Sequence, residues 1–182
     1  MRDYVVIARF DEATDKSLFS LRDKFEHAGF CIQEWPPHLT IAAYENIEEK
    51  LLRDWSEEFS KNHNSFEIVL HSLGVFPPSG DKGESSVLFL APAHSKTLID
   101  FYYAFHAKHE EYCTGIGWYN SIVHGNPVIH CTLGVIDKGK LQEAINAVFE
   151  SNTFATAKIT ALELYTYPMR LIQRFELKKK GD

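Results

Sequence analysis

The alternation of apolar and polar residues predicts short strands interleaved with amphipathic helices. Residues 4–10 are apolar and rich in β-branched side chains, which is typical of a buried strand. Residues 11–29 have the spacing of a helix, with an N-cap at Thr14 and a stop at Gly29. The apolar face of this helix is formed by Leu18, Leu21, Phe25 and Ala28.

The same criteria predict the remaining elements. Strands are expected at residues 38–44, 66–76, 86–90, 128–136, 153–165 and 171–177. Helices are expected at residues 47–62, 95–112 and 140–149. Residues 77–83 are rich in proline and glycine, and they indicate a hairpin loop rather than a linker between domains.

The order of these elements repeats along the chain. Strand, helix, strand, helix, strand occupies residues 4–76, recurs in about 86–165, and is followed by a final strand at about 169–178. We therefore predict a single bilobal domain of the α+β class over residues 1–182. A duplication of this kind folds as two antiparallel sheets with outer helices, related by a pseudo-twofold axis, with an active-site cleft between them.

One motif occurs once in each repeat, inside a proline-bounded apolar run. The two copies are His38-Leu39-Thr40-Ile41 and His130-Cys131-Thr132-Leu133. Alternate side chains of a strand share a face, so each copy presents an imidazole and a hydroxyl roughly 7 Å apart on one side. A pseudo-twofold axis brings the two copies face to face.

Composition narrows the possible partners. The net charge of −6 disfavours binding along a long nucleic-acid duplex, which requires a basic surface. No apolar run approaches the roughly 18 residues that span a membrane, and the N-terminus does not have the pattern of a signal peptide. Cys31, Cys113 and Cys131 are odd in number and not spaced for a metal or redox pair. We expect a cytoplasmic protein with reduced thiols and no cofactor.

Two histidines and two threonines suit acid–base chemistry at a phosphate. One imidazole can accept a proton while the other donates one, and hydroxyl groups can bind the non-bridging oxygens. A zinc site would need three or four ligands, which His124 or Glu34 would have to complete from a loop. Cys131 is expected to point away from His130, which disfavours nucleophilic catalysis by its thiol.

The paired motifs resemble those of the 2H phosphoesterase superfamily, which includes the 2′-5′ RNA ligase-like proteins and cyclic nucleotide phosphodiesterases. The resemblance covers nearly the whole chain. It implies metal-independent cleavage or formation of phosphodiesters at a ribose 2′-OH, such as 2′,3′-cyclic nucleotides or 2′-5′ linked RNA ends. It also implies that His38 and His130 form the acid–base pair and that Thr40 and Thr132 anchor the phosphate. Which histidine is the acid and which the base stays open.

Other residues are weaker candidates for substrate contacts. The expected substrate-binding residues are Tyr119, Trp118, Arg170, His124 and Phe76. Arg170, Arg174 and Lys82 are the basic residues expected near the site, which favours a small nucleotide or an RNA end over a large RNA. The alternative function is a non-catalytic module that binds or senses a nucleotide phosphate. We expect a monomer.

Overall fold

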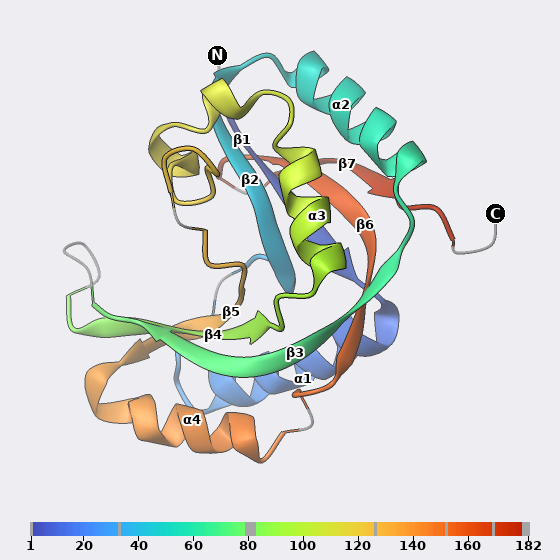
Figure 1. The fold of residues 1–182 in the computed structure, drawn as a ribbon. Coiled ribbons are helices and arrows are strands. Elements are labelled where there is room, and N and C mark those ends of the chain that lie inside the picture. The colour runs from blue at the N-terminus through green and yellow to red at the C-terminus, as the bar shows by residue number, and fades with distance from the viewer. Residues whose placement is uncertain are drawn as a thin grey trace.

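The computed structural model describes residues 2–32, 34–78, 83–125, 127–151, 153–168 and 170–179 (Figure 1). The strands are β1 (Arg2–Phe10), β2 (His38–Ile47), β3 (Phe66–Phe76), β4 (Ser85–Pro92), β5 (Cys131–Asp137), β6 (Thr156–Thr166) and β7 (Arg170–Glu176). The helices are α1 (Glu12–His27), α2 (Glu49–Asn62), α3 (Lys96–Phe105) and α4 (Leu141–Phe149). Short 3-10 turns are η2 (Glu110–Tyr112), η3 (Gly115–Gly117) and η4 (Lys138–Lys140). The predicted α+β class is confirmed.

Several local predictions were wrong. Strand β5 begins at Cys131 rather than at residue 128, so His130 lies just outside it, and Ile47 ends β2 rather than beginning α2.

The first and third helices also differ from the prediction. The N-cap of α1 is Asp11, whose carboxylate accepts a hydrogen bond from the Thr14 amide at 3.1 Å, so Thr14 lies inside the helix. The third helix was expected to reach residue 112 but ends at Phe105. His109 adopts a left-handed backbone conformation (φ 65°), which a continuing helix does not allow.

All strand pairs are antiparallel, in the order β2-β1-β6-β3-β4-β5, with β7 on β6. Strand β3 serves both halves of this arrangement, because Phe66–Val69 pairs with β6 and Leu70–Phe76 pairs with β4. The two predicted sheets are therefore joined through β3. In Figure 1 this strand is the long curved ribbon that runs below β6 toward β4.

The strand order is symmetric with respect to the two predicted repeats. Exchanging β1 with β4, β2 with β5 and β3 with β6 reverses the order onto itself. The third strand of each predicted repeat pairs with the first strand of the other repeat, because β6 pairs with β1 and β3 pairs with β4. The duplication and its boundaries stay a prediction, which this order supports.

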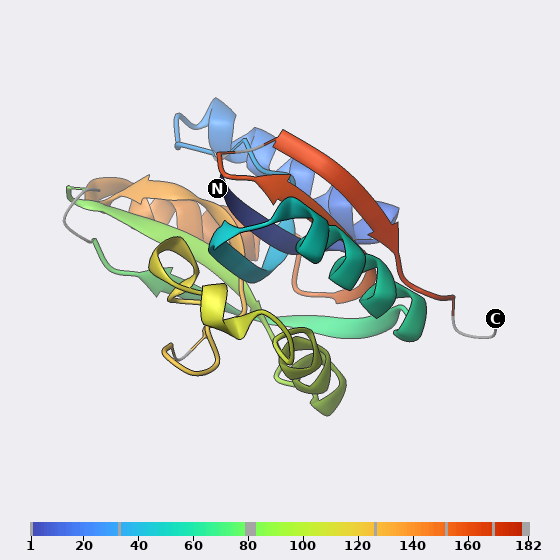
Figure 2. The same ribbon diagram turned by 90° about the horizontal axis from the view of Figure 1, so that it is seen from above.

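Each helix packs against a helix of the other predicted repeat (Figures 1 and 2). Helix α1 contacts α4 and β5. Helix α2 contacts β6 and β7, and it packs on α3 through the rings of Phe59 and Phe101, whose centroids are 5.0 Å apart. None of the helices among the described residues has the length and apolar character that a bilayer crossing requires.

The faces of β1 are both covered. Val6 and Ala8 belong to the main core, whereas Val5 and Ile7 belong to a second, smaller cluster on the opposite face. This second face also includes Tyr165, with Trp35 packed against it. The candidate site lies on this face.

The two ends of the strand order meet. Strands β2 and β5 are in contact, and the segment leading into β2 forms an isolated bridge with β5, in which the Val135 amide donates to the Cys31 carbonyl at 2.8 Å. The segment that leads into the first motif is therefore bonded to β5, the strand of the second motif.

Candidate active site

The first motif begins at the first residue of β2. His38 pairs with Arg9 across the sheet and is only 7% exposed. Its Nδ1 lies 2.7 Å from the carbonyl oxygen of Pro36. Because a carbonyl oxygen only accepts, Nδ1 carries the proton of this bond, and Nε2 of the neutral ring keeps its lone pair. Thr40 follows on the same face of the strand, half-buried.

The second motif is held in the same way. His130 immediately precedes β5, and its Nδ1 donates to the carbonyl oxygen of Val128 at 2.5 Å. Thr132 pairs with Phe89 of β4. Both imidazoles are thus bonded to the carbonyl two residues earlier, and both offer Nε2 for proton transfer.

The two motifs are neighbours in space. Strand β2, which begins with His38, is in contact with β5, which carries Cys131 and Thr132. Cys131 is itself completely buried, on the side away from His130, as its position in the strand predicted.

A buried guanidinium connects the motifs. Arg22 of α1 is 4% exposed and donates to the carbonyl oxygen of Trp35, three residues before His38, and at 2.5 Å to the carbonyl oxygen of Thr132. Sequence reasoning missed this residue. The signal was a charged side chain within the apolar face of a helix, because Arg22 lies four residues after Leu18 and three before Phe25.

Charged side chains beside the first motif are already paired. Arg9 contacts Glu163 at 3.1 Å and Asp15 at 2.5 Å. Arg174 contacts Glu163 at 2.9 Å and Glu176 at 2.5 Å. Arg174, one of the basic residues expected near the site, is therefore engaged with two carboxylates.

Aromatic rings flank both histidines. The Trp35 ring lies 5.5 Å from His38, and the rings of Phe76 and Phe89 lie 4.9 and 5.0 Å from His130. Phe76 stacks on Phe89 at 4.3 Å. This packing requires Gly74, where a Cβ would come within 2.2 Å of the Phe89 ring.

A sequence-family model described as the 2′-5′ RNA ligase superfamily matches residues 10–169. The chain belongs to this superfamily. The resemblance found in the two motifs is thereby confirmed, and membership supports a phosphodiesterase-type function. A search of curated proteins finds no match.

Solved structures share the superfamily fold at low sequence identity. TT0787 of Thermus thermophilus has a TM-score of 0.64 and 15% identity, with all of both chains covered. Escherichia coli LigT complexed with 3′-AMP has a TM-score of 0.59 and 13% identity over 98% of this chain and 99% of that chain. Kluyveromyces marxianus Usb1 with uridine monophosphate has a TM-score of 0.53 and 12% identity over 96% of this chain and 98% of that chain.

The two motif histidines differ in their electrostatic surroundings. Burial lowers the pKa of His38 to about 3, and the nearby positive charges of Arg22, His130 and Arg9 act in the same direction, against the bond to Pro36. Burial also lowers the pKa of His130, opposed by its bond to Val128. His38 is therefore a neutral imidazole in the free protein at neutral pH.

The remaining candidates lie on the surface. Trp118 and Tyr119 are 49% and 77% exposed, and His124 and Arg170 are exposed as well. Within the described residues, none of the four hydrogen-bonds to a motif residue through its side chain. Lys82 lies outside the described residues. Substrate contacts by these residues, and by Phe76 beside His130, stay predictions.

Two cavities in the described part of the chain lie elsewhere. One of about 640 Å³ is lined by residues of α3 and the start of β3, including Phe66 and Phe101. The other, of about 230 Å³, lies between the start of α1 and β6. Neither is lined by a motif residue, so the candidate site rests on the motifs themselves.

We predict that replacing Arg22 raises the pKa of His38. Arg22→Met removes a positive charge that disfavours the imidazolium, whereas Arg22→Lys keeps the charge and loses the two-carbonyl bridge. NMR titration of the histidine rings measures the shift, with Arg53→Met on α2 as the control. An unchanged His38 pKa in a folded Arg22→Met protein would contradict this electrostatic role.

We also predict a loss of stability in mild acid. Between about pH 6.5 and pH 3 the unfolded chain binds a proton at His38 that the folded protein does not bind. As the pH is lowered through this range, the free energy of unfolding therefore decreases by up to about 1.4 kcal/mol per pH unit. His130 acts in the same sense. Urea denaturation across this range tests it: His38→Asn should flatten the dependence, and the exposed His94→Asn should not. A wild-type stability independent of pH would refute a neutral buried His38.

Proposed function

We propose that this protein is a metal-independent phosphodiesterase that acts at a ribose 2′-OH and opens 2′,3′-cyclic nucleotides or cleaves 2′-5′ linked RNA ends. The observation that carries the proposal is the pair of imidazoles with Nδ1 tied to a backbone carbonyl, on motifs joined by Arg22. Such a pair can take and give a proton in one displacement at phosphorus.

The surroundings of the histidines suggest their separate roles. Burial and positively charged neighbours lower the pKa of His38, which keeps its ring neutral and able to accept a proton. We therefore assign His38 as the general base for an attacking water. His130 is more exposed, and no cationic side chain among the described residues contributes to lowering its pKa, so a bound anionic phosphate favours its protonated form. His130 then serves as the general acid.

The proposed hydrolysis of a 2′,3′-cyclic phosphate balances as follows. His38 Nε2 takes a proton from water, whose oxygen forms a bond to phosphorus. The bond from phosphorus to the ribose O3′ breaks, and His130 supplies the proton that this oxygen receives, leaving a 2′-phosphate. The hydroxyls of Thr40 and Thr132 donate to the non-bridging oxygens, where negative charge grows.

The substrate class is drawn from several observations. The LigT and Usb1 structures similar to this chain are complexes with 3′-AMP and uridine monophosphate. The half-buried rings of Trp35 and Phe76 provide aromatic surfaces next to the histidines on which a base can stack. With a net charge of −6 and the nearby arginines paired, we propose a small nucleotide or an RNA end rather than a long duplex.

The first functional test is turnover of four 2′,3′-cyclic mononucleotides and a 2′-5′ dinucleotide with EDTA present. We expect wild-type hydrolysis to be unaffected by EDTA and each of His38→Ala and His130→Ala to lose about 10²–10⁴-fold in rate. Thr132→Val should lose about 10²-fold, and the exposed His94→Ala should lose nothing. Tight binding without turnover of any substrate would instead favour a sensing module.

The pH dependence of kcat/KM tests the assignment of roles. We expect a bell, because the base must be neutral and the acid protonated. His130→Gln should lose the alkaline limb, where the acid deprotonates, and keep the acidic limb. The reverse outcome would exchange the two roles.

A further inference from the structure

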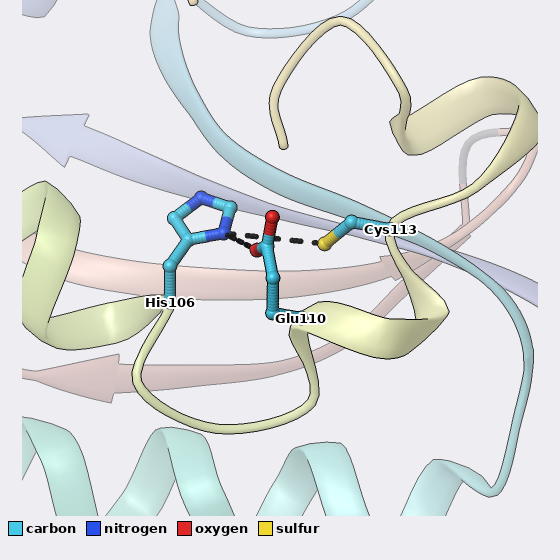
Figure 3. Close-up of side chains that lie close together, drawn as sticks. All are labelled: His106, Glu110 and Cys113. Carbon is cyan, nitrogen blue, oxygen red and sulfur yellow. Dashed lines mark hydrogen bonds and ion pairs between the residues drawn. The ribbon is translucent and has the colours of Figure 1, made fainter. Parts of the chain in front are cut away.

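A second cluster of polar side chains is formed by His106, Glu110 and Cys113 (Figure 3). His106 follows α3, Glu110 begins η2 and Cys113 follows it. One ligand atom from each of the three residues lies within 4.8 Å of the others, in a search of the described residues. The sequence did not predict this cluster, because a zinc site was considered only around the two His-x-Thr motifs, and this set combines three different ligand types.

The imidazole of His106 is held by a strand of the sheet. Its Nε2 lies 2.9 Å from the carbonyl oxygen of Ile41, the residue after Thr40, and therefore donates to it. Nδ1 consequently points to the Glu110 carboxylate, 2.5 Å away. A metal-ligating histidine characteristically donates its other ring N–H to a carbonyl or carboxylate, and His106 has this arrangement.

The carboxylate of Glu110 is oriented from its other oxygen. Oε1 accepts from the Ser121 hydroxyl at 2.5 Å and from the Val123 amide at 3.2 Å, which leaves Oε2 directed at His106. Burial works to raise the pKa of Glu110, but the hydrogen bonds from Ser121, His106 and Val123 outweigh it and lower the pKa. The group is therefore an anion at neutral pH.

Two buried polar groups belong to this part of the core. The Cys113 thiol is completely buried and lies 4.0 Å from His106 Nδ1. The Tyr44 hydroxyl is also completely buried and has no hydrogen-bond partner in the described structure. Burial raises the pKa of Tyr44, and the charges of Cys113 and Glu110 raise it further.

We propose that His106 Nδ1, Glu110 Oε2 and Cys113 Sγ are three of the ligands of a four-coordinate zinc ion. Nitrogen, oxygen and sulfur donors together are characteristic of Zn²⁺. A thiolate and a carboxylate neutralise the divalent charge, which a buried site requires.

The geometry needs small adjustments for the ion. Tetrahedral zinc with bonds of about 2.0–2.1 Å separates nitrogen and oxygen ligands by about 3.3 Å, so the His106–Glu110 pair opens by roughly 0.8 Å. The sulfur moves closer by about half an ångström, because zinc–sulfur bonds of about 2.3 Å place it roughly 3.5 Å from the nitrogen. Rotation of the three side chains supplies movements of this size.

Binding also has a defined proton balance. Burial raises the pKa of Cys113, so in the metal-free protein it is a thiol, and this thiol proton leaves when the sulfur binds zinc as a thiolate. The proton on His106 Nε2 stays on the ring and is donated to the Ile41 carbonyl oxygen. No oxidant or reductant takes part.

The proposed ion joins Glu110 of η2 to His106, whose ring is hydrogen-bonded to Ile41 of β2. The site lies close to the first motif but uses none of its side chains. Its role is structural, and the proposal does not depend on the proposed phosphodiesterase activity. Glu45 of β2 makes a parallel connection by accepting from the Ile116 amide at 3.0 Å. The ion thus reinforces a segment that already lies along the outer edge of β2.

Cobalt titration of the metal-free protein tests the site directly. We expect one Co²⁺ per chain, with the intense visible bands of a four-coordinate ion and a thiolate-to-cobalt charge-transfer band, and displacement by one equivalent of Zn²⁺. Calorimetry in buffers of different ionisation enthalpy should detect release of the thiol proton on zinc binding. Zinc should also raise the melting temperature.

Variants distinguish this cluster from adventitious binding. Cys113→Ser should abolish the charge-transfer band and weaken zinc binding at least about 100-fold, whereas Cys31→Ser, at the exposed cysteine, should leave both unchanged. His106→Gln should weaken binding as much, with the exposed His94→Gln as its control.

A six-coordinate spectrum without charge transfer in the wild-type protein would overturn the proposal, whether or not any variant folds. Failure of the nucleotide panel would leave these measurements unaffected. Conversely, absence of metal binding would leave the EDTA-resistant turnover standing.

Discussion

The buried guanidinium of Arg22 is the interaction on which the candidate active site depends. A charged group out of contact with water must find hydrogen-bond partners, and the partners of Arg22 are one backbone carbonyl at each motif. Carbonyl oxygens cannot move independently of their strands. The bonds of Arg22 Nη1 and Nη2 therefore hold the segment that enters β2 against β5, although β2 and β5 stand at opposite ends of the strand order.

Similar local geometry gives the two histidines different properties. Each ring is tied through Nδ1 to the carbonyl two residues earlier, so the tautomer and the direction of Nε2 are alike. The surroundings are not alike. His38 lies among Arg9, Arg22 and the core, whereas His130 lies against Phe76 and Phe89. Two equivalent motifs can in this way take unequal parts in an acid–base reaction.

The segment after α3 departs from the symmetry of the fold. It covers the outer edge of β2, where uncovered strand groups would otherwise invite pairing with another chain. Gly117 fits against this edge because a Cβ there would come within 1.9 Å of the Ala43 carbonyl oxygen. The cluster of His106, Glu110 and Cys113 lies in the same segment, which makes it a separate attachment of this segment to the sheet.

The sequence by itself determined the order of the elements, the α+β class and the two His-x-Thr motifs. These depend on local periodicity, in which residues two apart in a strand or three to four apart in a helix share a face. The end of α3 was missed because residues 106–112 contain no glycine or proline that would signal a stop, while the backbone turns at His109. The sequence also showed a charged Arg22 on an apolar helix face, but not what it binds.

Only the tertiary structure decided which distant groups meet. Arg22 reaches Thr132 across 110 positions, and Arg9 reaches Glu163 across 154. The exchange of β3 and β6 between the halves likewise depends on strand pairing rather than on composition. Hydrogen bonds and ion pairs of buried charges are set by the folded geometry, because each such group must find its partner among whatever the packing places within reach.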